Sequence, residues 1–252
     1  MEKPVALVTG ANQGVGLEVA TKLAAANYTV FVGSRSWKRA EEAVKTIAGD
    51  ARPLQLDVTD RVSIATAGER IRTEVGALNL LVNNAAISNV RKQQLGLSLA
   101  EYGKLSRASV VSIDEVKAIW ETNVFGVLAV YQVMLPLLRE AAWGRIVNVS
   151  SGVGSLTTNA NPAFPYRAMF VPGYSASKTA LNGITLAMMI ELEGTPIKVN
   201  LVSPGFTATN LNGFEGTESI ADGSREVVRV ALLGKDGPSG TFTRWNDVTI
   251  PW

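Results

Sequence analysis

The chain has 252 residues, a formal net charge of +2, and neither histidine nor cysteine. Without cysteine it has no disulfide framework and no thiol nucleophile. Without histidine it lacks the commonest general base and the commonest metal ligand. These absences exclude zinc chemistry and Ser-His-Asp hydrolysis. No metal site is expected, and acid–base work falls to Tyr, Lys, Asp or Glu.

The composition is ordinary for a soluble globular protein, with 46% hydrophobic and 18% charged residues. The small net charge gives no reason to expect a nucleic-acid or membrane partner. No run of about 18 uncharged apolar residues suggests a membrane span, and no signal peptide is recognised. We therefore expect a single domain over residues 1–252, located in the cytoplasm.

The first predicted strand, Val5–Thr9, leads directly into a glycine-rich turn and a helix over residues 17–26. A strand, a glycine turn and a helix in this order favour dinucleotide binding, because glycines let the backbone approach a pyrophosphate at the helix N-terminus. The alternative is a tight turn without a ligand. The residues expected to contact the cofactor here are Gly10, Asn12, Gln13, Gly14, Val15 and Gly16.

The second predicted strand, Tyr28–Gly33, ends in Ser34 and Arg35, and no carboxylate follows until Glu41. An NAD site usually has an acidic residue at this point, to bind the ribose 2′-hydroxyl. An arginine beside a serine suits a 2′-phosphate instead. The pattern therefore favours NADPH or NADP+ over NADH, with a basic first turn of the next helix as the alternative.

The third predicted strand, Arg52–Leu56, is followed by Asp57 and Val58. At a strand's carboxyl end, Asp57 is placed to reach an adenine amino group, with Val58 against the ring. The alternative is that Asp57 or Thr59 caps the helix predicted over residues 60–75.

A fourth strand, Leu78–Val82, precedes Asn83, Asn84, Ala85 and Ala86. The paired asparagines are expected to pin this turn to a neighbouring strand, and the small alanines to allow close approach of the cofactor. Strands alternating with helices predict an α/β fold: a Rossmann-type, doubly wound parallel sheet of about seven strands with helices on both faces.

Two stretches, residues 87–111 and 153–173, interrupt this rhythm and are too long for simple connections. The first is expected to be functional or partly helical. The second is rich in Asn, Pro and aromatic residues, and is either a substrate-facing loop or a plain surface loop.

Between them, Ser112 and Glu115 form a capping-box pattern that predicts the start of a long helix running to about Arg139. This helix contains Asn123, and Pro136 is expected to kink it near its end. A fifth strand over residues 145–149 follows.

Tyr174 and Lys178 lie one turn apart on a helix predicted over residues 173–193. An ammonium near a phenol favours the phenolate, so Lys178 is expected to lower the pKa of Tyr174 towards working pH. Alone, the pair also fits a solvated helix face. A sixth strand over residues 197–202 and a mostly helical stretch over 217–233 follow, and the tail contains one possible last strand.

Taken together, the motifs resemble the short-chain dehydrogenase/reductase family over essentially the whole chain. The motifs are T-G-A-N-Q-G-V-G from Thr9, N-N-A-A from Asn83, Asn123, Ser151, Tyr174-x-x-x-Lys178 and Pro204-Gly205, in the family's order. Gly33-Ser34-Arg35, the strand before Ser151 and the extra residues ahead of Tyr174 are most similar to the NADPH-dependent carbonyl reductases. Two departures are Ala86 in place of glycine and the absence of a basic residue from the glycine turn.

The resemblance implies hydride transfer from NADPH to a ketone or aldehyde, with Tyr174 protonating the oxygen and Ser151, not Ser150, donating a second hydrogen bond. It implies that Lys178 tunes Tyr174 and binds the nicotinamide ribose, and that Asn123 binds a proton-relay water. The cofactor contacts implied in addition to the glycine turn are Ser34, Arg35, Asp57, Val58, Asn84, Ala85, Ala86, Tyr174, Lys178, Pro204, Gly205, Thr207 and Thr209.

Two other functions stay open. One is a pathway-dedicated 3-oxoacyl-type reductase, which requires a basic docking patch for which Arg91 and Lys92 are the candidates. The other is a cofactor-binding regulatory protein without turnover, although such proteins tend to lose the Tyr or the Lys. The resemblance allows either a homo-oligomer or a monomer, because residues inserted before the Tyr helix can block its packing between subunits.

Overall fold

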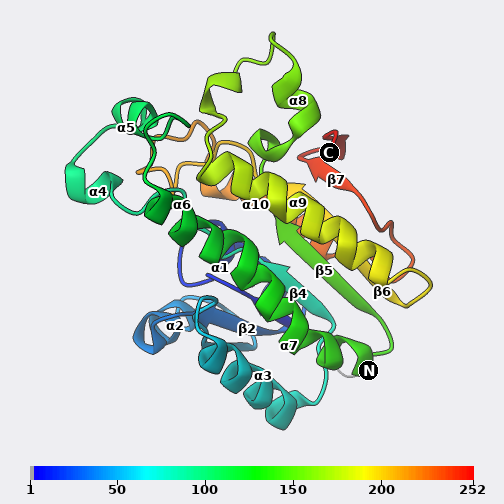
Figure 1. The fold of residues 1–252 in the computed structure, drawn as a ribbon. Helices are drawn as coiled ribbons and strands as arrows, with labels where there is room; N and C mark the ends of the chain where they lie inside the picture. The colour runs from blue at the N-terminus through cyan, green and yellow to red at the C-terminus, as the bar shows by residue number, and fades with distance from the viewer. Residues whose placement is uncertain (1–2) are drawn as a thin grey trace.

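A computed structural model describes residues 3–252. Its centre is one eight-stranded sheet in the order β3-β2-β1-β4-β5-β6-β7-β8, in which only β8 is antiparallel to its neighbour (Figure 1). The strands are β1 (Val5–Val8), β2 (Thr29–Ser34), β3 (Ala51–Gln55), β4 (Leu80–Asn83), β5 (Gly144–Val149), β6 (Ile197–Ser203), β7 (Phe242–Arg244) and β8 (Val248–Thr249). The predicted parallel α/β sheet is confirmed, and the tail supplies two strands where one was expected.

Helices cover both faces of this sheet, as the alternating pattern predicted. The helices are α1 (Gly14–Ala25), α2 (Trp37–Val44), α3 (Arg61–Val75), α4 (Lys92–Leu95), α5 (Leu99–Leu105), α6 (Ile113–Trp120), α7 (Gly126–Glu140), α8 (Leu156–Ala160), α9 (Tyr174–Glu191) and α10 (Ile220–Ala231). Buried residues of α3, α7 and α9 share one hydrophobic cluster, and those of α1, α2 and α10 share another. The sheet therefore separates two cores.

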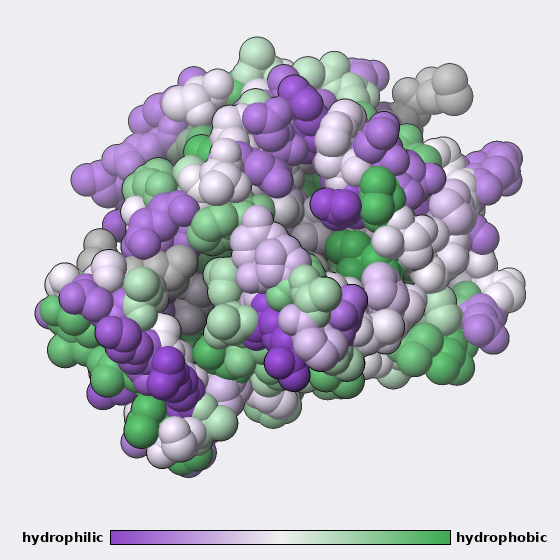
Figure 2. Space-filling view, turned by 90° about the horizontal axis from the view of Figure 1, so that it is seen from above, coloured by the Kyte–Doolittle hydropathy of each residue, from purple (hydrophilic) through white to green (hydrophobic). Residues whose placement is uncertain are grey.

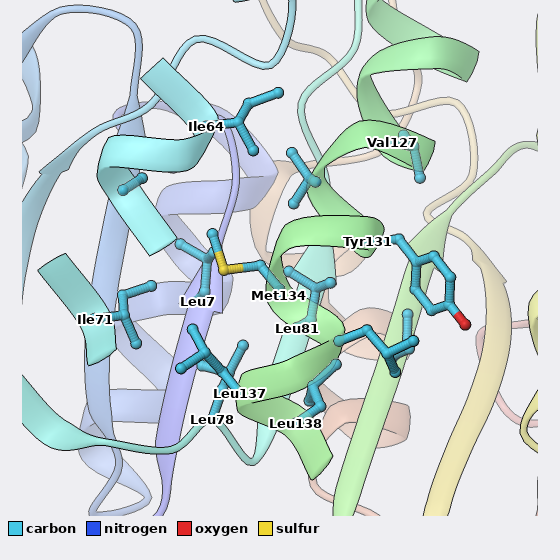
Figure 3. Close-up of a cluster of buried hydrophobic side chains, with 14 of the residues drawn as sticks. Leu7, Ile64, Ile71, Leu78, Leu81, Val127, Tyr131, Met134, Leu137 and Leu138 are labelled. Atoms are coloured by element: carbon cyan, nitrogen blue, oxygen red, sulfur yellow. The ribbon is translucent and has the colours of Figure 1, made fainter. Parts of the chain in front are cut away.

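The first of these cores is built around α7 (Figure 3). Met134, Leu137 and Leu138 of α7 are fully buried with Leu7 of β1 and Leu81 of β4. Burying one such side chain contributes about 1.5–3 kcal/mol. β1 and β4 are buried on both faces, which explains their uninterrupted apolar sequences.

The parallel strands all end at one side of the sheet, here termed the carboxyl edge. The strand order reverses between β1 and β4, since the chain runs outward from β1 to β3 and then returns to β4 on the other side. In open α/β sheets, ligands bind at the carboxyl edge near such a reversal.

The long helix predicted from Ser112 to Arg139 is divided by a π-helical turn, η1 (Glu121–Phe125). Pro136 lies inside α7, which continues to Glu140. The run Ile113–Glu140 is long and apolar enough to cross a membrane by length and composition alone, but 61% of its most apolar window is buried in the protein. Its apolar character is accounted for by its place in the core.

The predicted capping box at Ser112 and Glu115 is wrong. Ser112 is the N-cap residue but makes no side-chain capping bond within the described part of the chain. The Glu115 carboxylate instead accepts hydrogen bonds from Val90 N at 2.9 Å and Arg91 Nε at 3.1 Å. A guanidinium is a stronger partner for a buried carboxylate than a helix N-terminus alone.

The two interrupting stretches are ordered and partly helical. Residues 87–111 contain α4 and α5, as their composition indicated, and are here termed the first excursion. Residues 153–172 begin within the turn η2 (Gly152–Gly154), contain α8 and the 3₁₀ turn η3 (Arg167–Met169), and are here termed the insertion. The insertion connects β5 to α9 and rises above the sheet (Figure 1).

Candidate functional site

The glycine-rich turn at the end of β1 includes two glycines at positive φ, where a side chain would be strained. Gly10 has φ +62°, and a Cβ there would lie 2.9 Å from the Ala85 Cα. Gly14 has φ +58° and begins α1, with Thr209 beside it. Side chains at these positions would strain the backbone and fill the space in front of the helix N-terminus. The turn therefore has the open backbone surface that a pyrophosphate requires.

Polar groups after β4 hold this turn in place, as the asparagine pair predicted. Thr9 Oγ1 accepts hydrogen bonds from Asn84 N and Ala85 N, both at 3.0 Å. Asn84 Nδ2 donates to Thr9 O at 3.0 Å and to Gly10 O at 3.2 Å. The backbone of the turn is thus fixed against the neighbouring strand.

A second chain of polar groups is buried between β4, β5 and α9. Asn83 Nδ2 donates to Asn148 Oδ1 at 2.8 Å, and Asn148 Nδ2 donates to Thr185 Oγ1 at 2.8 Å. One turn towards the N-terminus of α9, Ser150 Oγ donates to Asn182 Oδ1 at 2.6 Å. These residues, here termed the asparagine network, fix α9 against the sheet.

The hydrogen bonds of the adjacent serines Ser150 and Ser151 show that the two residues have different roles. Ser150 is 2% exposed and points to Asn182, whereas Ser151 is partly exposed and forms a hydrogen bond with the Tyr174 hydroxyl. Lys178 Nζ donates to Val149 O at 2.8 Å and lies 5.7 Å from the centre of the Tyr174 ring. Ser151, Tyr174 and Lys178 therefore meet at the carboxyl edge of β5.

The pKa of Tyr174 differs from the sequence-based expectation. Burial raises the pKa of Tyr174 to about 12, although its hydrogen bond with Ser151 acts to lower it. Burial lowers the pKa of Lys178 to about 7. The expected lowering of the tyrosine pKa by an ammonium is wrong for the chain alone, because burial of the phenol outweighs its hydrogen bond with Ser151.

Asn123 is fully buried in the π-helical turn η1. Its Nδ2 donates to Ile87 O at 2.9 Å and to Ser177 Oγ at 3.0 Å, while its Oδ1 accepts from Ile87 N at 2.9 Å. Asn123 thus joins the chain after β4 to the helix that carries Tyr174 and Lys178. π-Helical turns are frequent at functional sites.

The end of β2 presents Arg35 to solvent, while Ser34 is 2% exposed and its Oγ accepts a hydrogen bond from Ser36 N at 3.3 Å. Lys38 and Arg39 are exposed in the first turn of α2. Of the two residues predicted to meet a 2′-phosphate, only Arg35 offers an accessible side chain.

Asp57 lies at the end of β3 and stabilises its own turn. Its Oδ1 accepts hydrogen bonds from Thr59 N at 2.9 Å and Thr59 Oγ1 at 2.7 Å. The cap of α3 is neither of these residues but Asp60, whose Oδ1 accepts from Val62 N at 2.9 Å. Val58 is buried beside this turn.

The segment after β6, residues 204–219, reaches back to the glycine turn. Asn210 Nδ2 donates to Gln13 Oε1 at 3.0 Å, and Thr209 faces Gly14. Thr207 is buried and donates to Pro204 O at 3.0 Å. The structure therefore brings Thr209 to the predicted cofactor surface and turns Thr207 into the loop.

The first excursion is tied to the same segment. Lys92 is 8% exposed, and its Nζ contacts Glu215 Oε1 at 2.6 Å and Asn212 O at 3.3 Å. Ser88 Oγ donates to Leu211 O at 2.5 Å. With Lys92 paired to Glu215 and Arg91 to Glu115, neither cation forms the free docking patch that a carrier-protein reductase requires.

The first excursion, the insertion and residues 204–219 gather around the carboxyl edge (Figure 1). Seen from above, this side is uneven, with hydrophobic residues scattered among hydrophilic ones (Figure 2). Within the insertion lies an open hollow of about 770 Å³. It is lined by Leu156, Asn159, Ala160, Pro162, Phe164, Pro165, Arg167, Ala168 and Phe170.

Sequence comparison is consistent with this arrangement. Residues 4–219 match the family model described as short chain dehydrogenase. The short-chain dehydrogenase anuI of Penicillium roqueforti is 36% identical over 241 residues, covering 92% of this chain and 90% of the relative.

Two solved structures share the fold. Salutaridine reductase from Papaver somniferum superposes with a TM-score of 0.77 at 27% identity, covering 95% of this chain and 99% of that one. The NADPH-bound carbonyl reductase from chicken fatty liver superposes with a TM-score of 0.82 at 24% identity, and both chains are covered completely. The glycine turn, the doubly wound sheet and the family match together establish that this chain belongs to the short-chain dehydrogenase family, whose members are oxidoreductases.

Proposed function

We propose that this protein is an NADPH-dependent reductase that converts a ketone or aldehyde to the alcohol. The observation that carries the proposal is the meeting of Ser151, Tyr174 and Lys178 at the carboxyl edge of β5, which only β4 separates from the strand before the glycine turn. The similarity to salutaridine reductase supports reduction as the direction of the reaction. We assign residues 1–252 to one catalytic domain acting in the cytoplasm.

The residues of the carboxyl edge fit a dinucleotide. The backbone around Gly10 and Gly14 would hold the pyrophosphate, and Asp57 and Val58 would hold the adenine. When bound, NADPH supplies the hydride. The other backbone and side-chain contacts proposed for the cofactor are Asn12, Gln13, Val15, Gly16, Asn84, Ala85, Ala86, Pro204, Gly205, Thr207 and Thr209.

The preference for NADPH rests on Arg35. Its guanidinium is exposed at the end of β2, where it would be able to bind a 2′-phosphate, and no acidic side chain lies between Ser34 and Glu41 to bind a 2′-hydroxyl instead. A guanidinium binds phosphate through two parallel hydrogen bonds. The buried Ser34 would contribute only by fixing the backbone beside Arg35.

Tyr174 is the proton donor in this proposal. With a pKa of about 12 its hydroxyl is protonated at neutral pH, so it can donate a proton to the oxygen of a carbonyl as that oxygen gains charge. Ser151 donates a second hydrogen bond to the same oxygen. Lys178, with a pKa of about 7 and its Nζ 5.7 Å from the centre of the Tyr174 ring, would supply the proton that returns to Tyr174, would take a proton in turn from solvent, and would bind the ribose hydroxyls.

Asn123 affects Tyr174 and Lys178 by fixing the position of the helix that carries them. Its amide side chain is occupied by Ile87 and Ser177, so a proton-relay water near Lys178 would have to bind its backbone carbonyl. The asparagine network and Asn123 together hold α9 in the orientation that the proton transfer needs.

The test is an assay of NADPH oxidation with a panel of aliphatic and aromatic ketones and aldehydes. We expect turnover with several members of the panel and slower turnover with NADH. Tight NADPH binding without oxidation by any carbonyl would instead identify a cofactor-binding protein without turnover.

A further inference from the structure

The end of the chain lies beside the insertion (Figure 1). The β7–β8 hairpin turns the chain back so that Ile250 N donates to Phe242 O at 2.8 Å. Ile250 is 7% exposed, and its Cδ1 is 4.0 Å from where a Cβ on Gly152 would lie. The C-terminal segment therefore packs directly after Ser151, where the insertion begins.

Trp252 contacts the insertion through its main chain. Its main-chain oxygen accepts hydrogen bonds from Thr157 Oγ1 at 2.9 Å and from Thr157 N at 3.4 Å. The Trp252 ring lies edge-on to the buried Phe242 ring, with centroids 6.2 Å apart and planes at 63°. Such aromatic pairs are worth about 0.5–1.5 kcal/mol beyond the area they bury. Phe242 thus anchors Trp252, and Trp252 holds Thr157.

This contact is unusual within the insertion. Among the hydrogen bonds of the described residues, those from Thr157 to Trp252 alone tie residues 156–168 to another part of the chain. The remaining bonds of α8, such as those of Asn159 with Val153 O and Ser155 O, stay inside the region from residue 151 to 170. α8 begins two residues after Gly154, whose carbonyl accepts hydrogen bonds from Thr179 Oγ1 at 2.8 Å and Asn182 Nδ2 at 3.3 Å in α9. The bonds from Thr157 to Trp252 therefore add a second tie, inside α8 itself.

The helix α8 forms one wall of the 770 Å³ hollow, through Leu156, Asn159 and Ala160. Phe164 and Phe170, together with two prolines, supply the apolar part of the lining. Rings and prolines present flat, rigid apolar surface, which suits a ligand with a ring system. A small aliphatic ketone would not need this hollow.

We propose that Thr157 and Trp252 are positioning residues that set the width of the hollow, and that the hollow binds the ring portion of a ring-bearing ketone whose carbonyl reaches Tyr174. The inference rests on the proposed reductase function and adds a substrate class to it. Neither residue touches the reacting atoms, so both act through the place of α8.

The test compares acetylnaphthalene, as the ring-bearing ketone, with butanone, as the small one. In Trp252→Ala and Thr157→Val, we expect KM for acetylnaphthalene to rise about five- to tenfold with kcat within about twofold, while both constants for butanone change by less than about twofold. Thr157→Ser keeps the hydroxyl and should match the wild type with both ketones.

Trp245→Ala is the matched control. Trp245 is also an exposed tryptophan of the C-terminal hairpin, but its ring lies against Arg225 of α10, 5.3 Å away, and not against the insertion. It should leave both substrates unaffected. Thr157 is exposed, so its substitution to Val is not expected to unfold the protein.

The outcomes separate the two proposals. Equal losses for both ketones, or no change for either, would overturn the positioning role while leaving the reductase function intact. A wild-type protein that reduces neither ketone nor any carbonyl of the panel would overturn the reductase function, and the inference with it.

Discussion

The asparagine network and the insertion both adjoin α9, the helix that carries Tyr174, and are built differently. Asn148 and Thr185 of the network are at most 1% exposed and joined by short hydrogen bonds between strand and helix. The insertion is mostly exposed and, from residue 156 to 168, is tied to another part of the chain through Trp252. The group proposed for chemistry is thus held rigidly, whereas the surface proposed for substrate recognition can vary.

The largest expected effect comes from removing the proton donor. Tyr174→Phe deletes only the hydroxyl, so turnover should fall about a thousandfold, within the range for loss of a general acid. NADPH binding, followed by cofactor fluorescence, should change little because the ring and Lys178 remain. Full turnover in this variant would refute the assignment of Tyr174.

The network should be far more sensitive to substitution than the insertion. Asn148→Ala leaves Asn83 and Thr185 without their buried partner and should lower the free energy of unfolding by about 2–3 kcal/mol. Phe164→Ala, in the partly exposed insertion, should cost less than about 1 kcal/mol. Urea unfolding measures both, and comparable losses would remove the contrast between the two regions.

Cofactor preference should respond to a single exposed charge. Arg35→Asp removes the guanidinium and repels a 2′-phosphate, so the ratio of kcat/KM for NADPH over NADH should fall about tenfold or more. Lys45→Asp makes the same change of charge at the C-terminal end of α2 and should leave the ratio near the wild-type value. An unchanged ratio in Arg35→Asp would mean that Arg35 is only a surface residue.

The smallest expected effect is a change of the free energy of unfolding with pH. It comes from Lys178, whose pKa falls from 10.5 to about 7 on burial. Below pH 7 the folded and unfolded chains both bind this proton, and the full cost of charging the buried amine is present. Between pH 7 and 10.5 the unfolded chain binds more protons than the folded chain, so stability rises with pH. Above pH 10.5 the amine is neutral in both the folded and the unfolded chain, so burying it no longer costs the free energy of charging it.

Lys178→Met removes this titration. The unfolding free energy of the wild type minus that of the variant should therefore increase by about 1 kcal/mol per pH unit above pH 7. Chemical denaturation of both proteins at about pH 7, 8 and 9 measures how this difference changes with pH. A difference independent of pH would mean that Lys178 stays charged in the folded protein.

Much of the fold could be predicted because its signals are local. The β-branched runs at Val5 and Arg145, the glycine turn and the order of helices and strands each depend on neighbouring residues. What failed were predictions that required knowing a distant partner. Glu115 matched a local capping pattern but binds Val90 and Arg91, and Lys92, a candidate for a basic docking patch, pairs with Glu215.

By itself, the sequence determined the family, the doubly wound sheet and the identity of the residues proposed for chemistry, because spacing along a strand or helix places those residues at one edge. Only the tertiary structure decided which serine faces Tyr174, that burial outweighs the hydrogen bond with Ser151 in setting the pKa of Tyr174, and that Thr157 of the insertion bonds to Trp252. These features depend on burial and on contacts between segments far apart in the chain, and neither is encoded in local spacing.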